Sequence, residues 1–200
     1  MSISSLPPPT DKLITAAELL TIATDGRVSE LVRGRLVDMP PTQWAHGKVC
    51  LAIGAILTKY IDQYDVGHGT VNDSGIITKR NPDTVRGADA AFGSYVRLPK
   101  DQPPLGYWPV SPEIVFEVLS PTDRPGATLT KVAEYLGADV LAVVVVDFED
   151  YCVYLNARNR SPQTLNLQDQ LNLKQFLPES LPEWNVSIRE FFKYLPNLPV

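Results

Sequence analysis

Apolar and polar positions alternate with two different periods along the chain. Between residues 43 and 64 the apolar positions recur every three or four residues, which predicts a long amphipathic helix. Residues 128–136 have the same period and are followed by Gly137, so they predict a second helix that ends at this glycine. Residues 140–146 form an unbroken, mostly β-branched run, which is typical of a central strand covered on both faces.

Shorter apolar runs predict the remaining strands. Residues 76–78, 88–92, 114–119 and 151–155 are bounded mainly by polar residues, glycine or proline, and residues 28–39 alternate around Arg33-Gly34 as a hairpin would. The proline-rich residues 98–112 predict a connecting loop. The order strand, helix, strand over residues 114–146 predicts a βαβ crossover, so we expect a mixed α/β (α+β) fold, with one mixed sheet flanked by helices.

Two capping boxes predict further short helices. Thr15 with Glu18 predicts a helix over residues 15–23 that ends at Asp25-Gly26, and Ser187 with Glu190 predicts another before residues 191–194. Residues 1–11 contain three consecutive prolines and are typical of a disordered tail. We therefore expect one domain over residues 12–195, which is long enough to bury a substantial core.

Composition and charge limit the class of protein. The chain is 44% hydrophobic and 20% charged, as in ordinary soluble proteins, and its longest apolar run is far shorter than the roughly 20 residues that span a bilayer. Cys50 and Cys152 are too far apart in sequence, and too isolated, to support a disulfide framework or a zinc knuckle. We expect a cytoplasmic protein without a membrane segment.

The net charge of −5 argues against a general nucleic-acid coat, because nonspecific affinity for DNA comes from many Lys and Arg contacts to phosphate. A nuclease can still have this charge, since it needs carboxylates to hold its metal and can gather its basic residues on one face.

Several familiar sites are excluded by inspection of the sequence. A nucleophile elbow, an H-E-x-x-H helix, a phosphate-binding loop and a dinucleotide fingerprint are all missing, and the chain has just two histidines. The remaining candidates are Asp89 and Glu117, which interrupt segments otherwise suited to a core. A hard divalent cation such as Mg²⁺ is a natural partner for two such carboxylates.

Each candidate also has a simpler interpretation. Asp89 and Glu117 could point to solvent from the exposed faces of their strands. Lys131 lies between apolar residues of the predicted second helix, and it could occupy the wet face of that helix. Spacing alone leaves these alternatives open.

Taken together, the segments resemble the Uma-type restriction endonuclease family that is abundant in cyanobacteria, a branch of the PD-(D/E)xK nuclease superfamily. The resemblance covers most of the predicted domain and depends on the order and spacing of the segments. They are residues 29–39, 44–49, 86–92, 112–123, 131–136 and 143–147.

This resemblance implies a restriction-endonuclease-like fold and a hydrolase that cleaves phosphodiester bonds of DNA with Mg²⁺ or Mn²⁺. It makes Asp89 the motif aspartate, Glu117 the second acid and the carbonyl of Val118 a further metal ligand. The lysine expected two residues after Glu117 is replaced by Leu119, and the family pattern moves the lysine to Lys131 on the following helix. Ala88 replaces the motif proline, which supplies no ligand.

The resemblance also brings two secondary candidates, Glu30 and His46. An acid from the N-terminal part of related nucleases often borders the metal, so Glu30 is a candidate for the site; it could also be a surface strand residue. His46 falls in a matching segment and could equally be a residue of a helix terminus. We expect Ser120 and Asp123 to shape the turn before the Lys131 helix and to cap that helix.

Two function classes follow. The first is a metal-dependent DNA endonuclease, for which a double-strand cut would favour a homodimer. The second is a catalytically inactive nuclease fold that serves as an interaction module in a defence, transposon or regulatory assembly. A junction-resolving or repair nuclease is a third, weaker alternative.

Overall fold

The computed structural model describes residues 12–22, 29–120, 125–196 and 198. The predicted tail over residues 1–11, the predicted helix stop at Asp25-Gly26 and the predicted cap Asp123 lie outside this part of the chain. Within the described residues, no helix is both long enough and apolar enough to cross a membrane.

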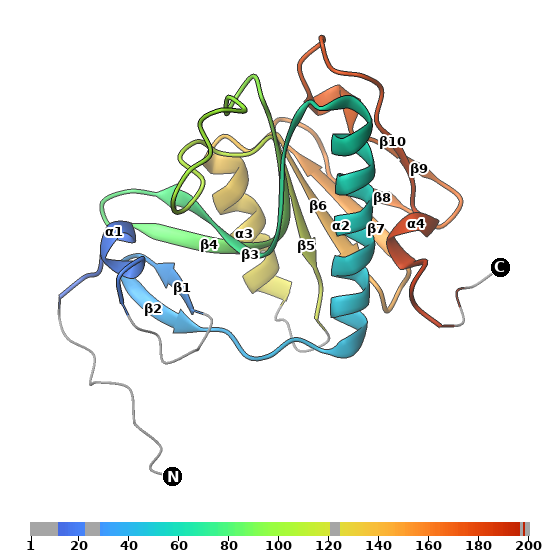
Figure 1. Ribbon diagram of the computed structural model, residues 1–200. Helices are drawn as coiled ribbons and strands as arrows, with labels where there is room; N and C mark the ends of the chain where they lie inside the picture. The colour runs from blue at the N-terminus through green and yellow to red at the C-terminus, as the bar shows by residue number, and fades with distance from the viewer. Residues whose placement is uncertain (1–11, 23–28, 121–124, 197, 199–200) are drawn as a thin grey trace.

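The elements follow the predicted order along the chain (Figure 1). The helices are α1 (Ala16–Leu19), α2 (Trp44–Tyr64), α3 (Pro125–Gly137) and α4 (Arg189–Phe192), with a short 3-10 helix η1 (Lys174–Phe176). The strands are β1 (Ser29–Val32), β2 (Arg35–Asp38), β3 (Gly67–Lys79), β4 (Thr84–Ser94), β5 (Ile114–Val118), β6 (Ala142–Asp147), β7 (Cys152–Ala157), β8 (Gln163–Leu165), β9 (Gln170–Asn172) and β10 (Asn185–Ser187).

Within the described residues, eight strands form one mixed sheet in the order β2-β1-β4-β5-β6-β7-β8, with β3 also paired to β4. The pair β5–β6 is parallel and encloses α3, as the predicted βαβ crossover requires, whereas the other pairs are antiparallel. Strands β9 and β10 form a separate two-stranded sheet.

Helices α2 and α3 lie on opposite sides of the central strands (Figure 1). The side chains of β5 alternate between these sides: Phe116 and Val118 pack in the cluster that contains α2, whereas Val115 packs with Val132 and Tyr135 of α3. The α2 cluster continues into the C-terminal segment, where the ring of Tyr60 stacks on Trp184 with centroids 4.1 Å apart. The alternation therefore directs Glu117, the neighbour of Phe116, towards the α3 side.

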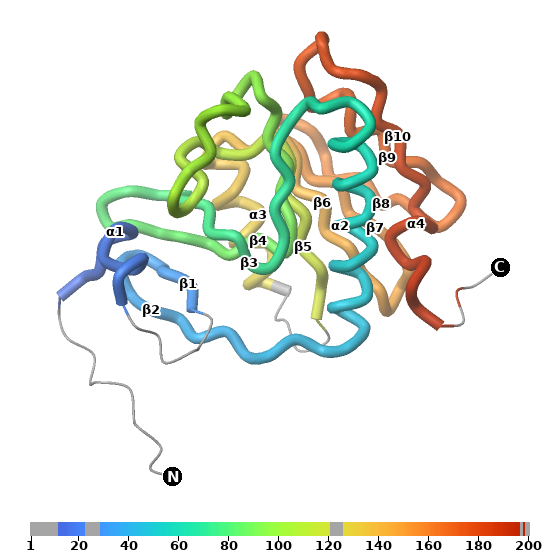
Figure 2. Tube along the Cα trace, viewed as in Figure 1, coloured from blue at the N-terminus to red at the C-terminus, as the bar shows by residue number. Residues whose placement is uncertain are grey.

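Strand β4 has partners on both edges, and this arrangement leaves a gap. Strand β3 pairs with β4 along nearly its whole length, so β1 and β5 must share the other edge. Strand β1 meets that edge at Val85 and β5 meets it at residues 90–92. Residues 86–89 lie between these two pairings. The trace in Figure 2 shows the loop of residues 95–112, which follows β4 and rises above β3 and β4 as an irregular segment.

Most predicted elements are confirmed with revised bounds, but β3 is far longer than the predicted strand of residues 76–78, and β8, β9, β10 and η1 were not predicted. The capping box of Thr15 and Glu18 is present, although α1 is shorter than predicted, and the hairpin turns at Arg33-Gly34. The predicted capping box of Ser187 and Glu190 is wrong, because α4 begins after Ile188 without a side-chain cap. Ser187 instead pairs in β10, where strand geometry competes with the capping role.

Candidate functional site

In the gap between β1 and β5, backbone groups of β4 have no neighbouring strand to pair with. Side chains form hydrogen bonds to them instead. The N–H of Gly87 donates to Glu30 Oε1 at 3.2 Å. The carbonyl of Gly87 accepts from the Tyr135 hydroxyl at 3.3 Å and from Lys131 Nζ at 3.5 Å. Buried backbone groups need such partners, so the gap gathers polar side chains from β1 and α3.

Asp89 lies at the end of this gap and is 8% exposed. Its Oδ2 accepts a 2.7 Å hydrogen bond from the N–H of Val118, and its Oδ1 lies 3.3 Å from His46 Nε2. Val118 directly follows Glu117 on β5, and the charge of Asp89 acts on the Glu117 carboxyl. The two predicted acids therefore meet.

Glu117 is buried on the α3 side, with 7% of its surface exposed. Its Oε1 accepts a 2.8 Å hydrogen bond from the Tyr135 hydroxyl, and its Oε2 lies 3.4 Å from Lys131 Nζ. Burial raises the pKa of Glu117 to about 7; the charge of Lys131 opposes this rise and the charge of Asp89 adds to it. The interpretation of Asp89 and Glu117 as solvent-facing strand residues is wrong.

Lys131 reaches into the same gap from α3. Its side chain is 18% exposed, and Nζ lies 2.9 Å from Glu30 Oε1 as well as 3.4 Å from Glu117. Burial works against the charged form of Lys131, but the carboxylates of Glu117 and Glu30 outweigh it and raise the pKa of the ammonium. The alternative that Lys131 occupies the wet face of its helix is wrong.

Glu30 connects this cluster to a second cation. Its side chain is buried on β1, and its Oε2 accepts a 2.6 Å hydrogen bond from Arg86 Nη1. Arg86 Nε in turn donates to Glu134 Oε2 at 2.6 Å. The surface-strand alternative for Glu30 is wrong, since the side chain faces the gap and joins Arg86 to Lys131.

His46 is buried in the first turns of α2 and approaches Asp89 from that helix. It lies near the helix start, as the alternative interpretation supposed, and it also contacts Asp89. Its Nδ1 lies 3.4 Å from Cys50 Sγ, one turn further along the same helix. The five candidate side chains Asp89, Glu117, Lys131, Glu30 and His46 thus gather around the gap.

Sequence reasoning missed three neighbours of these residues. Tyr135 follows Lys131 by four positions, so helical spacing could have placed both on one face of α3. Arg86 stands three positions before Asp89, but nothing in the local sequence indicates its contact with Glu30. Asp73 was also missed, because its position near the site depends on an irregularity in β3.

Asp73 approaches the gap through a bulge in β3. Asn72 and Asp73 have φ angles of 66° and 54°, and the β3–β4 register shifts between Val71 and Ser74. A Cβ at Gly87 would lie 3.0 Å from Asp73 Cβ and 3.1 Å from its carbonyl oxygen, so the glycine permits this close approach. Partial burial, and then the charge of Asp89, raises the pKa of the Asp73 carboxyl. Asp73 therefore adds another carboxyl group beside Gly87 and near Asp89.

The donor set fits a hard divalent cation. Asp89 and Glu117 supply carboxylate oxygens from adjacent strands, and the raised pKa of Glu117 reflects negative charge gathered in a buried place. Mg²⁺ and Mn²⁺ prefer such oxygen ligands. Lys131 contacts Glu117 but does not fully offset the burial of its charge.

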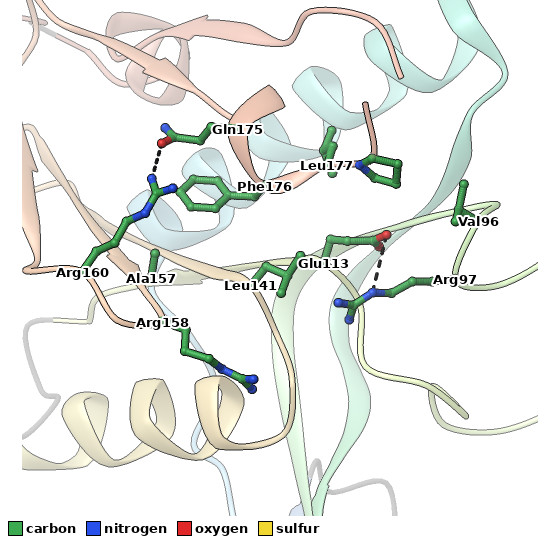
Figure 3. Close-up of a pocket in the computed structure, with 11 residues that line it drawn as sticks. Val96, Arg97, Glu113, Leu141, Ala157, Arg158, Arg160, Gln175, Phe176 and Leu177 are labelled. Atoms are coloured by element: carbon green, nitrogen blue, oxygen red, sulfur yellow. Dashed lines mark hydrogen bonds and ion pairs between the residues drawn. The ribbon is translucent and has the colours of Figure 1, made fainter. Parts of the chain in front are cut away.

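A hollow of about 490 Å³ lies at the other end of the β4–β5 pair (Figure 3). Its polar lining contains Arg97, Glu113, Arg158 and Arg160, and Figure 3 shows Arg97 directed at Glu113. The side chains of these arginines already have partners within the chain. Arg97 and Arg158 donate to backbone carbonyls, and Arg160 contacts Gln175 and lies over the ring of Phe176.

Comparisons with known proteins agree with this architecture. The model of the Uma2 family, described as "Putative restriction endonuclease", matches residues 16–187. A crystal structure from Anabaena variabilis, described as "a putative nuclease belonging to DUF820", is similar with a TM-score of 0.74 and 15% identity, over 90% of this chain and 98% of that chain. No curated protein matches significantly. The structural likeness confirms the predicted mixed α/β fold.

Proposed function

The chain belongs to the Uma2 family of restriction-endonuclease-like proteins, and we propose that it is a metal-dependent endonuclease that hydrolyses phosphodiester bonds of DNA. The observation that carries the proposal is the meeting of Asp89, Glu117 and Lys131 at the gap, from three different elements. Two buried acids beside a lysine form an arrangement suited to phosphodiester hydrolysis.

The acids are the proposed metal ligands. Asp89 and Glu117 would hold Mg²⁺ or Mn²⁺ through their carboxylate oxygens, and the carbonyl of Val118 would complete the protein ligands. When bound, such an ion polarises the phosphodiester and lowers the pKa of a water molecule. The Val118 N–H fixes one oxygen of Asp89, which leaves less conformational freedom to lose when the ion binds.

The remaining side chains position the reacting groups. Lys131 presents its ammonium beside Glu117, where it can orient the attacking water or stabilise charge on the phosphate. Glu30 holds this ammonium from the opposite side, and His46 holds Asp89. The Tyr135 hydroxyl orients Glu117 through its 2.8 Å hydrogen bond.

The start of α2 offers groups for substrate binding next to the site. Trp44 is 63% exposed, and the ammonium of Lys48 lies 5.1 Å from the centroid of its ring. Exposed aromatic rings stack on bases, and ammonium groups contact phosphates. A local cationic and aromatic surface of this kind lets a chain of net charge −5 bind DNA. Cutting both strands would require two sites, which favours a homodimer.

Cleavage of supercoiled and linear DNA by the purified chain tests the proposal. We expect cleavage with Mg²⁺ or Mn²⁺, none with a chelator, and loss of cleavage in Asp89→Asn. Asp147→Asn is the matched control, because Asp147 is an acid at the end of the neighbouring strand β6 whose carboxylate accepts from backbone N–H groups of the following turn.

Cleavage that is equal in chelator, or unchanged in Asp89→Asn, contradicts the assignment. A folded protein that cleaves no DNA with either ion would instead favour the nuclease-fold interaction module. Calorimetry with Mg²⁺ separates these cases further: binding that Glu117→Ala abolishes supports the nuclease, and no binding to the native chain favours the interaction module.

A further inference from the structure

Asp89 has a second set of neighbours on the α2 side, away from Glu117. His46 and Cys50 are four residues apart on α2, so their side chains lie on one face of the helix. The imidazole stands between the other two groups: Nδ1 lies 3.4 Å from Cys50 Sγ, and Nε2 lies 3.3 Å from Asp89 Oδ1. One donor atom from each of the three residues lies within 4.8 Å of the other two.

We propose that His46, Cys50 and Asp89 form a binding site for a transition-metal ion of the zinc class, distinct from the oxygen-ligand site towards Glu117. Zinc bonds to sulfur, nitrogen and oxygen of about 2.0–2.3 Å place tetrahedral ligands roughly 3.5 Å apart. The separation of Cys50 Sγ and His46 Nδ1 already has this value. An ion binds one ring nitrogen, so the carboxylate of Asp89, now nearest to Nε2, would move towards the Cys50 side of the ring to complete three protein ligands.

The chemistry of the donors sets the kind of ion. Thiolate and imidazole select Zn²⁺, Co²⁺ and similar ions, whereas Mg²⁺ prefers oxygen and rarely accepts sulfur. Cys50 and His46 are the soft donors of this set, and both are partly or fully withdrawn from solvent. Asp89 therefore has two unlike sides: oxygen donors towards β5 and sulfur and nitrogen donors towards α2.

Sharing Asp89 gives the second site a consequence for activity. A zinc-class ion that takes the Asp89 carboxylate removes a ligand from the oxygen site, so it should inhibit cleavage supported by Mg²⁺. This consequence rests on the proposed nuclease function. Binding of the ion does not, and it can be measured without DNA.

Cobalt titration of the metal-free full-length chain is the direct test. Bound Co²⁺ should give a thiolate-to-cobalt charge-transfer absorption with visible bands typical of a tetrahedral site. Cys50→Ser should abolish the charge-transfer band and weaken Co²⁺ binding at least about tenfold, and His46→Asn should weaken it similarly. Zn²⁺ should also raise the melting temperature of the native chain but not of Cys50→Ser.

The chain provides a matched control for each variant. It has two cysteines and two histidines, so Cys152→Ser and His68→Asn make the same atomic changes away from the cluster. Both should bind Co²⁺ as the native chain does. Circular dichroism tests whether each variant is folded. If Cys50→Ser does not fold, Cys50→Ala replaces it in the titration.

Three outcomes overturn the proposal. They are the absence of Co²⁺ binding to the native chain, an unchanged charge-transfer band in folded Cys50→Ser, and loss of that band in Cys152→Ser. The first would mean that Cys50, His46 and Asp89 contact one another without binding a metal. Co²⁺ binding without any DNA cleavage would leave this site standing and contradict the proposed nuclease function.

Discussion

The β4–β5 pair carries a buried glutamate at each end, and the two glutamates have opposite surroundings. Glu113, 1% exposed, accepts from the N–H of Ser94 at 2.9 Å and from its hydroxyl at 2.6 Å, and it faces Arg97 at 3.6 Å. Glu117, four residues further along, has Tyr135 and Lys131 as partners but also the nearby charge of Asp89.

The difference shows that burial of an acid does not by itself make a site. At the Glu113 end the donors match one carboxylate, which serves to join β4 to β5 and the following loop. At the Glu117 end several acids share fewer cations, and the resulting excess of negative charge is suited to a cation. Perturbed acids of this second kind are the ones expected at functional sites.

The sharpest way to separate the two ends is to neutralise each glutamate in turn. Glu117→Gln should lower Mg²⁺-dependent DNA cleavage on the order of a thousandfold, because it removes a metal ligand without changing the size of the side chain. Glu113→Gln should cleave at the native rate. Initial rates at saturating Mg²⁺ measure both, and equal losses in the two variants would break the comparison.

Removal of the Glu113 side chain should instead affect stability. Glu113→Ala leaves the buried N–H of Ser94 without its acceptor and removes the buried carboxylate beside Arg97, so we expect a loss of about 3 kcal/mol in the free energy of unfolding. Urea denaturation measures it, with exposed Glu149→Ala as the control. A loss below 1 kcal/mol, as for an ordinary surface residue, would show that Glu113 has no such structural role.

The pH dependence of stability should also distinguish the two ends. The pKa of Glu117 is about 7 in the folded chain against an ordinary value of 4.5, so the folded state keeps a proton that the unfolded state releases. The free energy of unfolding of the metal-free chain should therefore fall as pH rises from about 4.5 to 7.

Glu117→Gln should remove most of this decline, with a smaller part left to the raised pKa of Asp73, whereas Glu113→Gln should keep it. Urea denaturation at several pH values between 5 and 8 compares the three proteins. A native slope that persists in Glu117→Gln would mean that other groups cause it.

The smallest effects should come from two glycines of β4. A Cβ at Gly93 would lie 2.7 Å from the Trp108 ring, so Gly93→Ala should cost roughly 1–3 kcal/mol of stability. A Cβ at Gly87 would press on Asp73 at 3.0 Å. Gly87→Ala should therefore destabilise the fold less than Gly93→Ala, and it should weaken Mg²⁺ binding by displacing Asp73 beside the site. Thermal denaturation and calorimetry measure these changes, and an opposite ranking of the two stabilities contradicts the predicted packing.

Much of the fold was predictable because its signals are local. The period of residues 43–64 predicted α2 to within a residue, and the β-branched run of residues 140–146 predicted the central strand β6. The Ser187 capping box failed for a related reason: the same polar residue can cap a helix or pair in a strand, and here pairing with β9 decided the outcome.

The candidate site was predictable in part. The family resemblance selected Asp89, Glu117, Lys131, Glu30 and His46, and these residues gather around the gap. Arg86 and Asp73 could not be found in this way, because one depends on a contact 56 residues away in sequence and the other on a bulge in β3.

The sequence by itself determined the order of the strands and helices up to residue 155, the alternation that turns Glu117 away from the α2 core, and the helical spacing of His46 with Cys50 and of Lys131 with Tyr135. These are properties of neighbouring residues, which the periods of helix and strand dictate. Only the tertiary structure decided that β1 and β5 share one edge of β4 and leave residues 86–89 between them. Strand pairing joins distant segments, and the side chains that meet in that gap come from β1, β4, β5, α2 and α3.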